Sequence, residues 1–203
     1  LVVGGFAAGL GPDVFRREME KLTKDAFWDP APGLGLLRGR KFRALLDELL
    51  PVDDFSKLRI KTTISVFDLA RMKTRVLDEG ALAPAIHASC AVPLMFHPVR
   101  HAGGLLVDGG VADRPGVRGI PADARTLYHH LPTTARWRTD RRVPLAENRA
   151  ALVLTGLPRP SPNALDEGKR AYAAALSATR RALRTPVDAG RVDVTLTDAD
   201  LAN

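Results

Sequence analysis

The first fifty residues carry apolar side chains at helical spacing, interrupted by segments rich in glycine and proline. Residues 1–8 are small and apolar, which predicts a helix packed closely against a sheet. A second helix is predicted to begin at Asp13. Residues 27–37 are rich in Pro and Gly and predict a loop, whereas residues 40–50 predict a short amphipathic helix.

In the middle of the chain, the spacing of apolar and polar residues changes. Residues 58–68 alternate between apolar and polar side chains and predict a strand, and residues 76–78 fit a short second strand. Residues 81–91 are mostly small and predict a helix. Two prolines predict a rigid loop at residues 96–99, and residues 104–107 predict a short buried strand.

The last third begins with a polar, Arg-rich region and returns to regular structure near its end. Residues 150–154 predict a strand, and residues 165–183 predict an Ala-rich helix after a Pro-rich break. Strands that alternate with helices favour a layered α/β fold.

Composition narrows the class of protein. The chain has 203 residues, of which 45% are hydrophobic, and this predicts one domain with one core. Mean hydropathy is −0.07, and no stretch approaches the roughly 18 apolar residues of a membrane-spanning helix. The single cysteine, Cys90, excludes a disulfide-stapled scaffold. The chain begins with Leu1 inside an apolar segment, which predicts a fragment of a longer protein.

The charge is basic, with 30 Lys and Arg against 23 Asp and Glu and a net charge of +7. The basic residues are scattered, apart from a modest cluster of arginines in residues 136–149. Aromatic residues make up only 5%, whereas single-stranded nucleic-acid binders place aromatic side chains beside basic ones. We therefore expect a solvated, Arg-rich surface with a weak attraction to anionic lipid, and no nucleic-acid partner.

The strongest local candidate for chemistry is the turn that follows residues 104–107. An apolar strand there ends in Asp108, and active sites of open α/β sheets lie at the carboxyl ends of strands. Gly109 and Gly110 follow, which allows a tight turn and a close approach of another segment. By itself this pattern is also that of an ordinary turn.

A second motif precedes this turn at a short distance. It has the form Ala-Ser-x-Ala-x-Pro-x-x-Phe-x-Pro, and its fixed positions are Ala88, Ser89, Ala91, Pro93, Phe96 and Pro98. Together with the strand and its Asp-Gly-Gly end, the motif resembles the signature of the patatin-like phospholipases. The resemblance covers residues 1–117 and thins beyond them.

The resemblance implies a three-layer α/β/α fold with a mostly parallel central sheet, over a single domain of residues 1–203. Residues 1–117 would be the core, residues 118–149 an Arg-rich insert or loop, and residues 150–203 a closing strand and C-terminal helix.

The resemblance also implies a serine hydrolase that cleaves lipid acyl esters with a Ser–Asp dyad and without a metal or organic cofactor. Asp108 would be the general base, and Gly109 and Gly110 would shape the turn that holds it. Pro93, Phe96 and Pro98 would form a rigid wall beside the site, and Ser89 would be structural. We expect a cytoplasmic protein, or one peripheral to the inner membrane face, with a lipid substrate or membrane surface as its partner.

One element of the family pattern is missing. No G-x-S-x-G elbow occurs among the serines of this sequence, which are Ser56, Ser65, Ser89, Ser161 and Ser177. The opening residues resemble the helix that follows the family's elbow. We therefore expect an N-terminally truncated domain, with the nucleophile just upstream of Leu1 and the oxyanion loop and first strand further upstream.

Other candidate sites are weaker. Ser89 beside Cys90 lacks an elbow, and Cys90 has no basic neighbour in the sequence. His97 and His101 are four residues apart, but Pro98 prevents the helix that would bring both to one zinc ion. Asp113 is more typical of a cap or turn than of a second base.

The sequence is also compatible with a function of a different class. The chain is alternatively a catalytically inactive relative that kept the fold, lost the nucleophile, and binds proteins or anionic membrane surfaces through its basic residues.

Overall fold

A computed structural model describes residues 2–132, 147–158, 164–165, 167–184 and 190–201. The chain divides into two compact units, Leu1–Ile120 and Pro121–Asn203, and each is described by itself. The expectation of one domain over residues 1–203 stays a prediction. The arginine cluster expected in residues 136–149 lies mostly outside the described residues.

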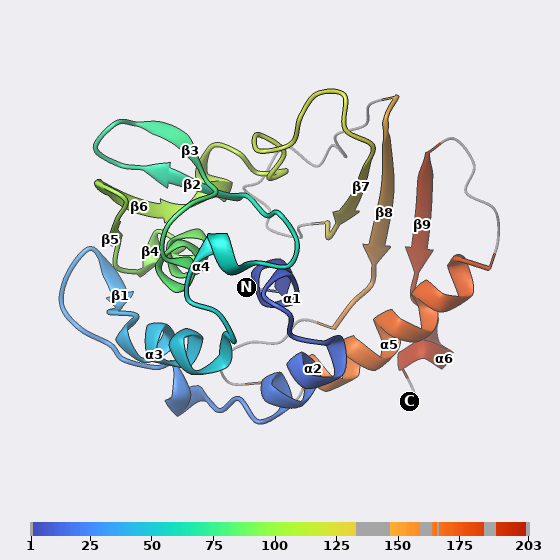
Figure 1. Cartoon of the computed structure of the whole chain (residues 1–203). Coiled ribbons are helices and arrows are strands. Elements are labelled where there is room, and N and C mark those ends of the chain that lie inside the picture. Colours follow the sequence, from blue (N-terminus) through green and yellow to red (C-terminus); the bar gives the residue numbers. More distant parts are fainter. Residues whose placement is uncertain (1, 133–146, 159–163, 166, 185–189, 202–203) are drawn as a thin grey trace. The chain divides into compact units, whose positions relative to one another are not determined.

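The first unit contains four α-helices and three short 3-10 turns (Figure 1). The helices are α1 (Val2–Ala7), α2 (Pro12–Glu20), α3 (Arg40–Leu49) and α4 (Leu82–Cys90), and the turns are η1 (Lys24–Ala26), η2 (Phe55–Lys57) and η3 (Gly109–Val111). Helix α2 begins at a proline, whose fixed φ and missing N–H suit a first helical position. The helices predicted from apolar spacing are therefore found, within a few residues at each end.

A four-stranded sheet in the order β3-β2-β6-β5 is antiparallel throughout. Its strands are β2 (Ile64–Asp68), β3 (Lys73–Leu77), β5 (Val99–His101) and β6 (Gly104–Asp108). Strands β2 and β3 form a hairpin with Ile64 opposite Leu77, and β5 and β6 pair with His101 opposite Gly104. The connections within each hairpin are too short for parallel pairing, so β2 with β3 and β5 with β6 are antiparallel.

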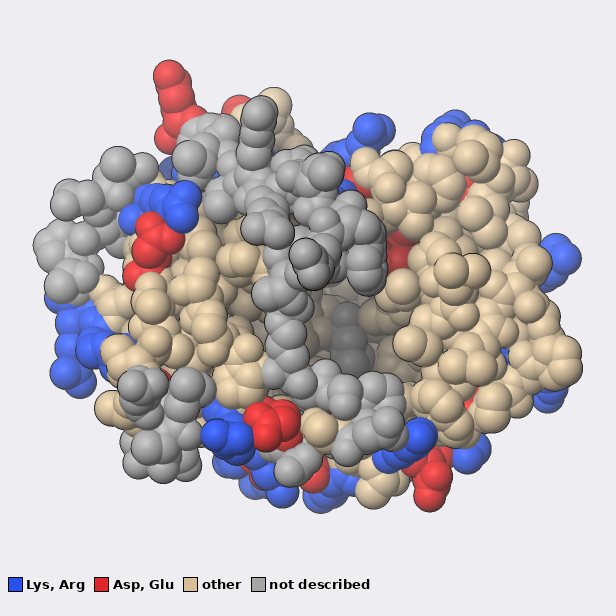
Figure 2. Space-filling view, turned by 180° about the vertical axis from the view of Figure 1, so that it is seen from behind, with Lys and Arg blue, Asp and Glu red and all other residues tan. Residues whose placement is uncertain are grey.

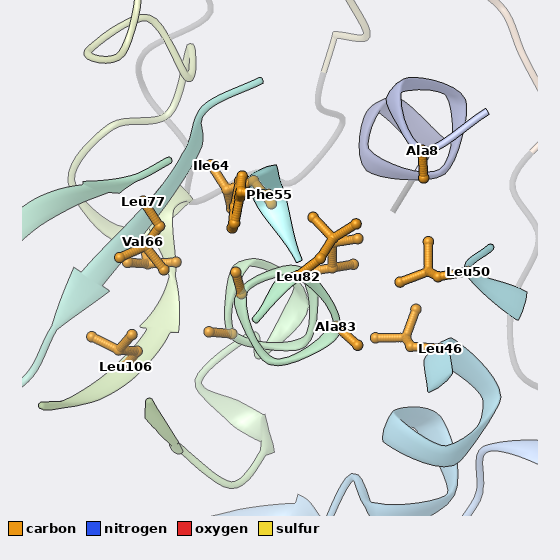
Figure 3. Packing of buried hydrophobic residues seen from close by; sticks show 13 residues of the cluster. Ala8, Leu46, Leu50, Phe55, Ile64, Val66, Leu77, Leu82, Ala83 and Leu106 are labelled. Carbon is orange, nitrogen blue, oxygen red and sulfur yellow. The ribbon is translucent and has the colours of Figure 1, made fainter. Parts of the chain in front are cut away.

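Helix α4 lies in the middle of the hydrophobic core (Figure 3). One side of the helix faces Val66 of β2 and Leu106 of β6, and the other faces Leu46 of α3. The helix can be buried on two sides because it consists largely of small residues, and Ala85 and Ala88 are wholly inaccessible to solvent. The small-residue pattern of residues 81–91 thus predicted the helix, and the same small side chains allow its close packing.

Two short strands that were not predicted from the sequence form a parallel pair, and the first of them lies within the predicted loop at residues 27–37. Strand β1 (Gly35–Leu37) pairs with β4 (Leu94–Phe96), with Gly35 opposite Leu94 and Leu37 opposite Phe96. The predicted rigid loop at residues 96–99 is correspondingly the junction between β4 and β5. Strands of three residues have too few alternating positions to stand out from a loop in a sequence.

A buried carboxylate joins the two hairpins of the sheet. The Asp68 side chain is fully buried and accepts hydrogen bonds from the backbone N–H groups of Ala70 and Arg71. The guanidinium groups of Arg71 and Arg75 donate to its Oδ2 at 2.7 and 3.3 Å, and also reach the carbonyls of Gly103 and Ala102. Burial raises the pKa of Asp68, but the hydrogen bonds from Arg71 and Arg75 outweigh it and lower the pKa from 3.8 to about 2.

This lowered pKa makes the fold sensitive to acid. Because the carboxylate is more acidic in the folded chain, its contribution to stability is complete above pH 3.8 and is lost as the pH falls through about 2. We expect Asp68→Asn to be less stable than the unsubstituted protein at pH 7, and the difference to shrink toward pH 2. Urea unfolding midpoints at several pH values measure this difference.

Asp78→Asn is the matched control, because Asp78 is exposed at the end of β3. It removes the same charge, and because its side chain is exposed it should change the unfolding midpoint at pH 7 much less than Asp68→Asn does. A difference for Asp68→Asn that stays constant down to pH 2 contradicts the assignment.

The described residues of the second unit form a parallel sheet and two helices. Its strands β7 (Thr126–His130), β8 (Arg149–Thr155) and β9 (Arg191–Thr195) run parallel in that order, and its helices are α5 (Glu167–Ala182) and α6 (Asp198–Leu201). Leu154, Ala178 and Val194 form its core. Arg181 of α5 binds the Asp200 carboxylate with two hydrogen bonds of 2.8 Å, and these bonds, with those from Thr197, lower the pKa of Asp200.

The α/β class is confirmed by this combination of helices, two parallel sheets and one antiparallel sheet. Strand β8 and helix α5 lie where the sequence predicted them. Strand β7 falls inside the segment assigned to an Arg-rich insert or loop, so residues 118–149 include regular structure as well.

Candidate functional site

Asp108 lies at the carboxyl end of β6 and begins the turn η3. Its side chain is half-buried, and Oδ1 accepts a hydrogen bond of 2.6 Å from the backbone N–H of Gly110. The strand fixes the position of the Asp108 backbone, and this short hydrogen bond fixes the orientation of the carboxylate. The end of the strand and the turn therefore hold the Asp108 carboxylate in one orientation.

A hydrogen bond connects Asp108 to the preceding motif. The backbone N–H of Asp108 donates to the carbonyl of Ala91, at 3.0 Å, and Ala91 is the C-cap residue directly after α4. Ala88 and Ala91 are both fully buried, so larger side chains at these positions would push the helix end away from β6. The two sequence motifs are therefore neighbours in space.

Gly109 has no room for a side chain. A Cβ atom at Gly109 would lie 2.7 Å from the carbonyl carbon of Ser65, on the neighbouring strand β2. A Cβ atom at Gly110 would meet Asp108 Oδ1 at 2.8 Å. The two glycines thus serve different purposes: Gly109 lets the turn lie against β2, and Gly110 leaves space for the carboxylate.

Ser65 and Asp113 connect the turn to β2, a contact that was not predicted from the sequence. Ser65 Oγ donates to Asp113 Oδ2 at 2.9 Å, and the backbone N–H groups of Val117 and Arg118 donate to the same carboxylate. Asp113 is buried and behaves as the turn residue that its position suggested. Nothing local in the sequence marks this pair, because its members are 48 residues apart.

The sequence profile of the patatin-like phospholipase family matches residues 1–120, which is more than half of the chain. The chain belongs to the patatin-like phospholipase family. An uncharacterised NTE family protein of Mycobacterium bovis is 31% identical over 129 residues, and so is one of Mycobacterium tuberculosis. These matches cover 60% of this chain but only 36% of each relative, so the chain spans well under half of their length.

The match ends at residue 120, where the first compact unit also ends, so the family's part of the chain and the first unit coincide.

Helix α1, which resembles the patatin-like helix that follows the nucleophile, packs directly on α4. A Cβ atom at Gly4 would lie 2.6 Å from Cδ1 of Ile86, so the glycine permits this close contact. Ala8, just beyond the end of α1, is buried in the same core cluster as Ile86. The same helix α4 thus contacts α1 and, through Ala91, the strand that carries Asp108.

The described serines of this patatin-like chain have other hydrogen-bond partners. Ser89 Oγ donates to the carbonyl of Ile86 at 2.8 Å, one turn back in its own helix, as expected of a structural residue. Ser56 Oγ donates to Asp54, and Ser65 Oγ to Asp113. Ser161 lies outside the described residues.

The three residues expected to form a wall differ in their surroundings. Phe96 is partly buried and packs against the rings of Phe42 and His87, with centroid distances of 5.8 and 6.2 Å. Pro93 is exposed just after α4, and Pro98 connects β4 to β5. Their role as a wall beside Asp108 stays a prediction.

The histidines considered as zinc ligands have separate environments. His97 Nε2 lies 3.3 Å from the carbonyl oxygen of Ala31. Burial and the charges of Arg43 and Arg75 lower the pKa of His101. Among the residues that the structure describes, no group of three or more His, Cys, Asp or Glu side chains is arranged to hold a metal ion.

Charge is spread over the surface. Figure 2 shows Lys and Arg side chains at several separate places on one face, with Asp and Glu beside some of them. Within the described part of the chain, no helix is both long enough and apolar enough to span a bilayer.

Proposed function

We propose that this chain is the Asp-bearing part of a lipid acyl hydrolase that uses a Ser–Asp dyad. The observation that carries the proposal is the position of Asp108: a half-buried carboxylate at a strand end, oriented by the N–H of Gly110 and joined through Ala91 to the family motif. The serine belongs to residues ahead of Leu1 in the complete polypeptide.

In the acylation step, Asp108 accepts the proton of the serine hydroxyl while the serine oxygen attacks the ester carbonyl carbon. The tetrahedral intermediate then expels the lipid alcohol, which takes the proton from Asp108, and an acyl-enzyme remains. In deacylation, Asp108 accepts a proton from water as the water attacks the acyl carbon. The fatty acid leaves, and the proton returns to the serine oxygen.

A carboxylate performs this function only if it stays in place during both steps. The hydrogen bond from Gly110 and the bond from the Asp108 N–H to Ala91 hold it against two different elements. The hydrogen bond between Ser65 and Asp113 links β2 to the residues that follow the same turn. This rigidity supports the assignment of Asp108 as the general base.

The test is made on the full-length protein, with a fluorophosphonate probe that labels activated serines and with phosphatidylcholine vesicles as substrate. We expect one labelled serine, located ahead of Leu1 within a G-x-S-x-G sequence, and release of fatty acid from the vesicles. Mass spectrometry of the labelled peptide identifies the serine, and heat-denatured protein is the control for nonspecific labelling.

A folded full-length protein that neither takes the label nor releases fatty acid contradicts the proposal. The remaining candidate is then the inactive, basic surface-binding relative.

A further inference from the structure

A pocket of about 310 Å³ lies along the first turns of α3. The side chains that line it include Arg38, Arg40 and Arg43, with Gly39 between the first two and His87 from α4. Its volume is at the lower end of the range of roughly 300–1,000 Å³ typical of small-molecule sites. The pocket belongs to the first unit and does not include Asp108.

The pocket has an excess of positive charge. Three arginines line it with one acidic residue, Asp47, and both carboxylate oxygens of Asp47 accept from Arg43 Nε at 3.0 Å. The terminal nitrogens of Arg43 have no hydrogen-bond partner among the described residues, and Arg38 and Arg40 have no ion-pair partner there. The pocket therefore carries an excess of positive charge that an anionic ligand would balance.

His87 provides an independent indication of a ligand. The residue is only 7% exposed and lines the pocket, and its Nε2 is buried without a hydrogen-bond partner in the described part of the chain. A buried polar group without a partner typically destabilises a protein by about 1–3 kcal/mol. Burial and the charge of Arg43 lower the pKa of His87, whereas Asp29 raises it, so the ring is neutral at physiological pH.

Gly39 packs against His87 through its backbone. Its φ is +79°, a conformation that favours glycine, and any side chain here would collide with His87 Nε2. The missing side chain at Gly39 therefore leaves room for the imidazole in the lining of the pocket.

The start of α3 does not itself bind the ligand. The Asp29 carboxylate already accepts from the backbone N–H groups of Gly39, Arg40 and Lys41, at 2.9, 2.7 and 3.2 Å. This fixes the backbone from which Arg38 and Arg40 project, so the arginine side chains and His87 remain as the donors.

We propose that this pocket binds the phosphate group of a phosphate ester, with Arg38, Arg40 and Arg43 as its charged donors and His87 at its floor. Guanidinium groups bind phosphate oxygens in pairs, and a phosphate monoester carries a negative charge close to the pocket's net positive charge. The inference is independent of hydrolase activity, because it concerns binding alone and rests on residues outside the dyad. The phosphate comes from a lipid headgroup or from a soluble ester, and these sources share the same chemistry.

The experiment compares full-length protein with the double variant Arg38→Gln/Arg40→Gln. Both arginines are exposed, so the substitution leaves the core intact. The control is Arg100→Gln/Arg125→Gln, which removes two exposed arginines outside the pocket. Calorimetry measures the binding of inorganic phosphate and of glycerol 3-phosphate, and sedimentation measures binding to phosphatidylcholine vesicles with and without phosphatidic acid.

We expect saturable phosphate binding at one site, weakened about tenfold or more in the pocket variant and less than about twofold in the control. If binding to phosphatidic acid vesicles falls in parallel, the ligand is a lipid headgroup. If only glycerol 3-phosphate and inorganic phosphate are affected, the ligand is a soluble ester.

Absence of saturable phosphate binding, or equal losses in the pocket and control variants, overturns the proposal. Fatty-acid release by the same preparations reports separately on the hydrolase function.

Discussion

Full-length protein with Asp108→Asn is expected to turn over acyl esters about 100- to 10,000-fold more slowly, with the loss in kcat rather than in KM. This is the usual contribution of a general base to a rate. An amide cannot accept the serine proton at neutral pH, so acylation and deacylation are slowed together. Turnover of a p-nitrophenyl ester measures the effect, and labelling of the serine by a fluorophosphonate should fall as well.

The fold should tolerate this substitution. Asn retains a side-chain oxygen that accepts from the Gly110 N–H, and the backbone bond from residue 108 to Ala91 does not involve the side chain. We therefore expect the thermal midpoint to stay close to that of the unsubstituted protein.

Asp78→Asn is again the matched control, because Asp78 is an exposed aspartate at a strand end in the same unit. It should leave kcat unchanged. An Asp108→Asn protein that is folded and fully active shows that the base is another residue, and the dyad assignment is then wrong.

Gly109→Ala is expected to have the second-largest effect, because its methyl group would lie against the backbone of Ser65, 2.7 Å from the carbonyl carbon. The contact is with backbone atoms, which cannot move aside by changing a rotamer, so the turn must move away from β2. Overpacking of this kind typically destabilises a protein by about 1–3 kcal/mol. We expect a loss of that size in urea unfolding, together with reduced ester turnover, since Asp108 is the neighbouring residue.

Two glycine variants separate these effects. Gly11→Ala has nothing within 4 Å of the added atom and should change neither stability nor activity by much. Gly110→Ala places its methyl group 2.8 Å from Asp108 Oδ1, so it should lower activity with a smaller loss of stability. If Gly109→Ala is as stable and as active as Gly11→Ala, the turn does not depend on close contact with β2.

Much of the first unit was predictable because its elements have strong local patterns. The small residues of α4 and the apolar run of β6 each indicated their own secondary structure, and the glycines after Asp108 indicated a turn. The family resemblance added that these segments belong to one site, and the bond from Asp108 to Ala91 shows how they meet.

Other features were not predictable because they depend on segments distant in the sequence. Strands β1 and β4 have three residues each, and only their mutual pairing makes them strands. Ser65 meets Asp113 only because β2 lies beside β6, and the imidazole of His87 meets Gly39 only because α3 packs on α4.

Local patterns of apolar and small residues predicted the α/β class, and the Ala-Ser-x-Ala-x-Pro motif with its Asp-Gly-Gly turn predicted the family and the candidate base, because each pattern lies within a short segment. The hold on the Asp108 carboxylate, the antiparallel order of the four-stranded sheet and the pocket that combines three arginines with the buried His87 could not be predicted in this way. The physical reason is that these features arise from contacts between distant segments, and packing brings such segments together.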